Sequence, residues 1–201
     1  MLQVTALTLR KGSDATEIYA ALMNTGDAPA CSAAFSVELY DRNEQWLATG
    51  ISGLLSQRFF RRTDGSEAIA ACVGPGDVTM AALTDLPSDI VIEDVGHAIY
   101  RCPYFVLDVV PIDGLTVSEV TKITGDAGTT FAGTLVNELD VAVSDPLVLV
   151  FPVNRVGRPL GAARSSGMLE MPPGGSWSFE TDAIEEAGVD QLAFPAAALG
   201  D

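Results

Sequence analysis

The chain has 201 residues, 48% of them hydrophobic, and carries 11 Lys and Arg against 27 Asp and Glu, which gives a net charge of −16. This length and apolar content suit one large globular domain or two of about 100 residues, and they argue against a disordered chain. The acidic balance disfavours binding to nucleic acid or to anionic membrane surfaces, because both need a basic footprint.

No run of about 18 apolar residues occurs, so no membrane-spanning helix is predicted. The first residues, Met1-Leu2-Gln3-Val4, are typical of a strand and lack the basic and apolar regions of a signal peptide. Two locations therefore stay open. The protein is cytoplasmic, or it lies outside the cytoplasm after a leader or lipid anchor upstream of this chain has directed it there.

Short runs of alternating apolar and polar residues predict strands in the first half. Phe35, Val37 and Leu39 share one face of such a run, and Ser36, Glu38 and Tyr40 share the other. The predicted strands are 4–10, 16–23, 35–40, 46–48, 78–83 and 95–110, the last interrupted at Cys102-Pro103, because proline cannot donate to a strand ladder.

The same pattern occurs twice in the chain. A shift of 113 residues places Asn24 on Asn137 and Val37 on Val150 without a gap. Pro75-Gly76 falls on Pro173-Gly174 only at a shift of 98, so the first copy carries a fifteen-residue insertion at about 52–73. This repeat predicts an internal duplication.

The second half repeats the order, with predicted strands at 117–123, 130–136, 147–153, 158–163, 176–180 and 191–194, and one helical turn at 182–188. Residues 147–151 are apolar on both faces, where the first copy alternates. A strand buried on both sides has this composition. Either the other module or a second chain covers it, or it is a central strand with a few exposed aliphatic residues.

Short strands separated by turns, without crossover helices, predict an all-β fold. We expect two tandem immunoglobulin-like (Greek-key) β-sandwich domains from the duplication, at 1–112 and 113–201.

The stretch Val37-Glu38-Leu39-Tyr40-Asp41, following a strand that ends in Asn and preceding Pro75-Gly76, resembles the FxLYD domain family. Val37 stands where the motif has Phe. The second copy, Val150-Phe151-Pro152-Val153-Asn154, keeps an apolar residue and an Asn in place of Asp. The resemblance implies an immunoglobulin-like fold and a secreted or lipid-anchored prokaryotic protein, and it implies no general activity.

An oxidising compartment would favour a disulfide between Cys31 and Cys72, which would join the insertion to the front of the sheet and leave Cys102 free. The alternative is a cytoplasmic protein in which all three thiols are reduced and buried.

A catalytic site is not predicted. His97 is the single histidine, whereas a catalytic triad needs a base beside its nucleophile, and copper and zinc sites need more His and Cys ligands in suitable spacing. No Asp-x-Asp loop suggests calcium, so a calcium-binding adhesion module is the least favoured binding class. We expect no cofactor and no metal.

Two groups of residues are candidates for binding. Trp46 and Trp177 could stack on sugars, although tryptophan in a sandwich more often packs in the core. The cluster Arg58-Phe59-Phe60-Arg61-Arg62 in the insertion has the composition of a protein interface, or of a solvated hairpin with inward phenylalanines. The sequence favours a noncatalytic structural or interaction protein outside the cytoplasm, bound to a protein partner or to itself, with a carbohydrate or small-ligand binding module as the alternative.

Overall fold

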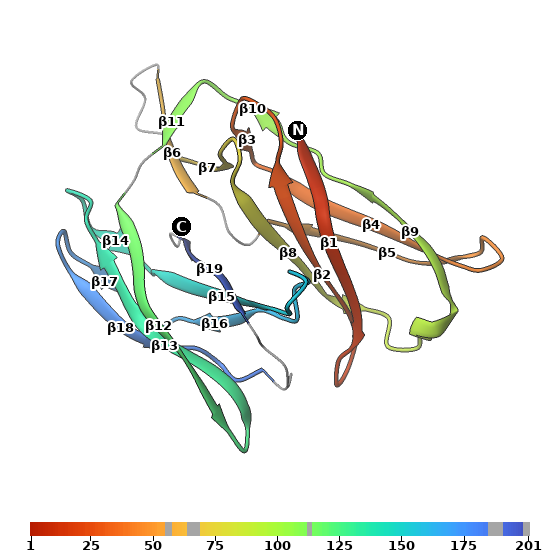
Figure 1. Cartoon of the computed structure of the whole chain (residues 1–201). Helices are drawn as coiled ribbons and strands as arrows, with labels where there is room; N and C mark the ends of the chain where they lie inside the picture. The colour runs from red at the N-terminus through yellow and green to blue at the C-terminus, as the bar shows by residue number, and fades with distance from the viewer. Residues whose placement is uncertain (55–57, 64–68, 112–113, 185–190, 199–201) are drawn as a thin grey trace.

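The computed structural model describes residues 1–54, 58–63, 69–111, 114–184 and 191–198, with backbone only for 58–62, 69–71, 111 and 191–198. The described chain is all-β and forms several antiparallel sheets (Figure 1). Its only helical segment among these residues is a short 3-10 turn, η1 (Ile92–Asp94).

The described residues of the N-terminal half, up to residue 111, form eleven strands. They are β1 (Leu2–Lys11), β2 (Thr16–Asn24), β3 (Ala30–Cys31), β4 (Ala34–Asp41), β5 (Trp46–Gly53), β6 (Arg58–Arg62), β7 (Ile69–Val73), β8 (Val78–Leu86), β9 (Val95–Arg101), β10 (Phe105–Val106) and β11 (Val109–Pro111). The C-terminal half, from residue 114, contains β12 (Leu115–Gly125), β13 (Gly128–Asn137), β14 (Val143–Ser144), β15 (Leu147–Val153), β16 (Ala163–Ser165), β17 (Glu170–Met171), β18 (Ser176–Glu180) and β19 (Gln191–Ala198).

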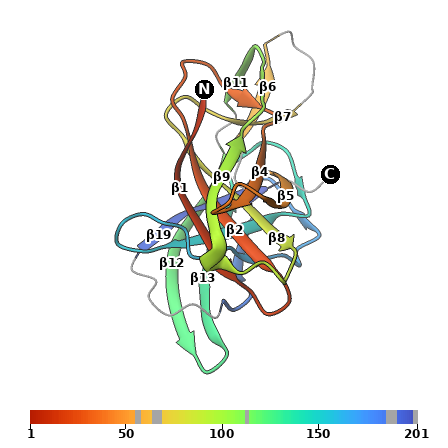
Figure 2. The same cartoon turned by 90° about the vertical axis from the view of Figure 1, so that its right-hand side faces the viewer.

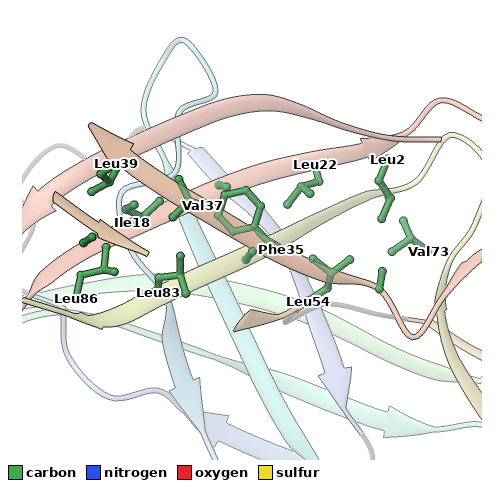
Figure 3. Close-up of a cluster of buried hydrophobic side chains, with 14 of the residues drawn as sticks. Leu2, Ile18, Leu22, Phe35, Val37, Leu39, Leu54, Val73, Leu83 and Leu86 are labelled. Atoms are coloured by element: carbon green, nitrogen blue, oxygen red, sulfur yellow. The ribbon is translucent and has the colours of Figure 1, made fainter. Parts of the chain in front are cut away.

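In the N-terminal half, sheet β1-β2-β8 faces sheet β5-β4-β9 across a hydrophobic core (Figure 3). The period-two pattern of β4 is confirmed, because Phe35, Val37 and Leu39 are buried there. Ile18 and Leu22 enter the same core from β2.

The C-terminal half repeats this arrangement of strands. Sheet β12-β13-β18 faces sheet β16-β15-β19, and the short pair β14-β17 corresponds to β3-β7. Its own core contains Phe131 and Leu135 from β13 with Val148 and Val150 from β15. Among the described residues, every paired strand has its partner in the same half.

Asn24, at the end of β2, is fully buried and joins three segments of the first half. Its Nδ2 donates to the carbonyl oxygens of Ala28 at 2.8 Å and Val73 at 2.9 Å, and its Oδ1 accepts from the backbone N–H of Gly26 at 3.0 Å. The side chain therefore satisfies backbone groups that would otherwise be buried without partners.

Asn137, at the end of β13, has the same environment. Its Nδ2 donates to the carbonyl oxygens of Val141 at 2.9 Å and Met171 at 3.1 Å, and its Oδ1 accepts from the backbone N–H of Leu139 at 3.0 Å. Each of these partners lies where the sequence repeat places it. The residues that are repeated in the sequence thus make equivalent hydrogen bonds in the two halves.

The turn after the central strand is also repeated. Asp41 Oδ1 accepts from the backbone N–H groups of Asn43 and Gln45, each at 2.8 Å. Asn154 Oδ1 accepts from those of Val156 and Arg158, each at 3.0 Å. Asn therefore replaces Asp without loss of the turn, because both side chains offer an oxygen to the backbone.

The two halves pack against each other, sheet on sheet. Leu149, Phe151 and Val153 of β15 lie against Ala21 of β2 and Met80 of β8. Strand β15 is thus buried on both faces, as its composition suggests, and the first half is what covers it. Figure 1 shows the result as four stacked sheets, with β5-β4-β9 on the right and β12-β13-β18 on the left.

The small sheet of the first half has the order β10-β3-β7-β6-β11, in which β6 comes from the insertion and β10 and β11 come from residues 105–111. Cys31 on β3 and Cys72 on β7 are opposite each other and form a disulfide, while Cys102 is a free thiol. Burial raises the pKa of the Cys102 thiol, so this thiol is less reactive than an exposed one.

Removing this disulfide should weaken the first half. The bond closes a loop with a sequence separation of 41, which constrains the unfolded chain by about 3 to 4 kcal/mol. We expect Cys31→Ala with Cys72→Ala to lower the free energy of unfolding by up to that amount, measured by urea denaturation. Cys102→Ala is the control, and an equal loss in that variant would show that the disulfide is not the cause.

Some boundaries differ from the predicted ones. The strand predicted at 158–163 is wrong in its position, because β16 begins only at Ala163. The residues before it form the connection from β15, in which the backbone N–H of Leu160 donates to the carbonyl of Pro152. The predicted strand 95–110 is three strands, β9, β10 and β11. Most of the helical turn predicted at 182–188 lies outside the described residues.

Candidate functional site

Sheet β5-β4-β9 turns one surface to the first core and the other to solvent. Directly opposite residues on antiparallel strands lie on the same surface, so the strand register gives the members of the outer one. We call it the open face; it consists of Trp46, Thr49 and Ile51 on β5, Ser36, Glu38 and Tyr40 on β4, and His97, Ile99 and Arg101 on β9. Figure 2 views the molecule from the side that carries these strands.

Three rings form a row across the open face. Tyr40 on the central strand is opposite Trp46 on one side and His97 on the other. The Tyr40 and His97 rings are stacked, with centroids 5.0 Å apart and planes 5° from parallel. One end of the row is therefore a fixed pair of rings, and the other end is a tryptophan.

Trp46 is 61% exposed, yet its orientation is fixed. Its Nε1 donates to Thr49 Oγ1 at 3.0 Å. Trp46 and Thr49 are three positions apart on β5, but the register shift beside Tyr40 places both on the same surface, opposite Tyr40 and Glu38. Positions two apart on β4, such as these, are separated by about 7 Å. The indole must consequently extend along the strand, which leaves an apolar ring surface turned to solvent.

Glu38 is the acceptor at the centre of the open face. Tyr40 Oη donates to Glu38 Oε2 at 2.8 Å, and Arg101 Nη1 lies 2.8 Å from Glu38 Oε1. These two hydrogen bonds, that of Tyr40 first, lower the pKa of Glu38, and the bond to Glu38 raises the pKa of Tyr40. Glu38 is therefore ionised and Tyr40 protonated near neutral pH, which keeps both hydrogen bonds intact.

The corresponding surface of the second half is not exposed. The repeat places Leu149, Phe151 and Val153 of β15 at the positions of Ser36, Glu38 and Tyr40. These three apolar residues are the ones that pack against the first half. The same face of the same strand is thus an internal interface in one half and open in the other.

The other candidate residues from the sequence lie elsewhere. Trp177, on β18, is half-buried against the second core, with its ring 6.1 Å from that of Phe179, which places it away from Trp46. The side chains of Arg58, Phe59, Phe60, Arg61 and Arg62 lie outside the described residues. Their backbone forms β6, an inner strand between β7 and β11, so it offers no free sheet edge.

His97 is held as part of the stacked pair. In the part of the chain that the structure describes, no group of three or more His, Cys, Asp or Glu side chains is placed to hold a metal ion. Asp41 Oδ1 is engaged with the backbone of its own turn. The chemistry that the open face offers is stacking and hydrogen bonding.

A shallow groove of about 660 Å³ lies where the halves meet, lined by Val4, Thr5, Ala6, Leu7, Tyr100, Asn154, Val156 and Arg158. Two of its polar groups are already used. Thr5 Oγ1 donates to the carbonyl of Ala21, and Asn154 Oδ1 accepts from the turn that it closes. The open face presents more groups for recognition than this groove does.

Sequence reasoning did not find the row of rings. It placed Tyr40 in a motif, Trp46 in the predicted strand 46–48 and His97 in the predicted strand 95–110, and only the pairing of β4 with both neighbours brings them together. The alternation in 35–40, which turns Tyr40 away from the core, was the available signal.

No protein-family model matches the chain, and no curated protein matches its sequence. No helix in the described part is both long and apolar enough to cross a membrane.

Proposed function

We propose that this chain is a noncatalytic interaction protein built from two tandem immunoglobulin-like β-sandwich domains of the FxLYD type, at 1–112 and 113–201, which arose by duplication. The shared strand order and the matching contacts of Asn24 and Asn137 support this assignment. Within the motif, Leu39 is buried, Tyr40 belongs to the open face and Asp41 closes the turn.

The observation that carries the proposal is the contrast between the two equivalent faces. The outer face of β15 is buried between the domains. The outer face of the β4 sheet remains exposed, and its side chains include Trp46, Ile51 and Ile99, each more than 40% exposed. Exposed apolar side chains gathered on one surface are typical of a binding site. The open face is therefore the surface that we assign to a partner.

An extracytoplasmic location is part of the proposal. The Cys31–Cys72 disulfide supports it, because disulfides persist in oxidising compartments. Alkylation of the protein as isolated from its native cells, followed by mass spectrometry, tests this part. We expect one modified cysteine, Cys102; modification of all three would place the protein in a reducing compartment.

The function is tested by probing protein and glycan arrays with the wild type and with two variants. Ile51→Asp puts a charge on the open face, and Thr134→Asp puts one on the outward-facing, half-buried surface of β13 as the matched control. We expect the signals of the wild type to be lost with Ile51→Asp and kept with Thr134→Asp. Signals that survive in Ile51→Asp would contradict the assignment, as would turnover of ester or glycoside substrates that His97→Ala abolishes.

A further inference from the structure

We infer that the open face is a carbohydrate-binding site for an uncharged glycan of pyranose units, with Trp46 as the stacking platform. This inference rests on the proposed function, since it names the class of ligand for the same surface. Three properties of the face carry it: the orientation of the indole, the balance of charge, and the contrast with the face of β15.

The indole of Trp46 offers the flat apolar surface that a sugar ring needs. A pyranose presents a face of C–H groups, which packs on an aromatic ring, and a rim of hydroxyls, which need polar partners. Because Nε1 is bonded to Thr49, the indole extends along β5 and stays 61% exposed. The stacking surface therefore exists before the ligand arrives.

Polar partners for the hydroxyls stand beside the indole. Each oxygen of Glu38 accepts one hydrogen bond, from Tyr40 or from Arg101, and a carboxylate oxygen can accept a second. The His97 ring, stacked on Tyr40, is fixed at the far end of the row. Because these side chains are already ordered, binding requires little further loss of conformational freedom.

The balance of charge favours a neutral ligand. Glu38 and Arg101 are the two charged members of the open face and neutralise each other. The protein as a whole carries −16, so an anionic polymer would be repelled. A ligand of hydroxyls and C–H groups needs no counter-charge.

The second domain shows what this face contains when it binds protein. There the equivalent positions are Leu149, Phe151 and Val153, which are aliphatic or aromatic without hydrogen-bonding groups. In the first domain they are Ser36, Glu38 and Tyr40, each of which carries a hydrogen-bonding group. This difference favours a hydroxyl-rich ligand over another β-sheet.

The experiment titrates the full chain with neutral hexasaccharides of glucose, xylose, mannose and N-acetylglucosamine, and with an oligogalacturonate as the anionic arm, by isothermal calorimetry. We expect the wild type to bind at least one neutral oligosaccharide and to bind the oligogalacturonate more weakly. Trp46→Ala should lower that affinity about tenfold or more, the factor that a lost stacking contact of about 1.4 kcal/mol represents. Trp46→Phe should retain part of the affinity, and Thr134→Asp should retain all of it.

Trp46 is exposed, so its variants are expected to fold, and their denaturation midpoints confirm this before titration. The inference is overturned if the folded wild type binds none of the neutral oligosaccharides, or if binding survives in Trp46→Ala. Protein-array signals that depend on Ile51, without any glycan binding, would overturn the glycan assignment and leave the proposed function standing. Loss of both would overturn both.

Discussion

Replacing Asn24 with alanine should lower the free energy of unfolding by about 2 to 4 kcal/mol. A buried polar group left without a hydrogen-bond partner costs about 1 to 3 kcal/mol, and this change removes the partner of several such groups. The carbonyls of Ala28 and Val73 would lose their donor, and the backbone N–H of Gly26 would lose its acceptor. The Asn24 side chain and the Val73 carbonyl are buried, so water cannot replace that bond without opening the end of the core, while the bonds to Ala28 and Gly26 are part-buried. Urea denaturation followed by circular dichroism measures the loss.

Asn137→Ala should have a similar cost, because its side chain makes the corresponding hydrogen bonds. Asn43→Ala is the control, since Asn43 is an exposed turn residue. If Asn24→Ala is no more destabilising than Asn43→Ala, the buried amide does not hold these segments together. If only one of the two buried asparagines matters, the repeated contacts are not energetically equivalent.

The repeat was the part of the fold that the sequence could predict in most detail. Asn24 and Asn137 stand out because a buried amide is fixed by its partners, and few other side chains can make the same three bonds. Gly76 and Gly174 were equally informative: both have positive φ, 77° and 69°, where glycine is the favoured residue. Positions with such specific geometric requirements keep their identity when the surrounding residues differ.

The candidate site was harder to predict, because it depends on pairing across the sheet. Alternation shows that Tyr40 points away from the core, but the identity of its neighbours depends on which residues of β5 and β9 lie opposite. Register shifts occur next to Tyr40 on both sides. A shift by one residue would have turned Trp46 or His97 to the other surface.

The sequence left undecided what buries the second face of β15, for a related reason. An apolar strand shows that something covers it, but the cover itself, Ala21 and Met80, has small or flexible side chains that are common in any core. A polar contact between the halves could also not be predicted from the sequence. Arg10 Nη1 donates to the backbone carbonyl of Leu160 at 2.9 Å, and a carbonyl is offered by every residue.

The junction between the halves leads to the second large effect. Phe151 is 1% exposed and packs against Ala21 and Met80 of the other half. Truncation of a buried phenylalanine to alanine costs about 3 to 5 kcal/mol. We expect Phe151→Ala to lose that stabilisation from the coupling between the halves, because each half has a separate core.

The wild type should therefore unfold in one transition, and Phe151→Ala in two, as measured by differential scanning calorimetry. Val156→Ala is the control, because Val156 is 76% exposed and its loss should leave the single transition unchanged. If Phe151→Ala instead keeps one transition at a lower temperature, β15 is needed for the fold of its own half and the junction is not a separable contact. If Phe151→Ala leaves both the temperature and the number of transitions unchanged, the halves do not stabilise each other through this sheet pair, and the rigid presentation of the open face would need another cause.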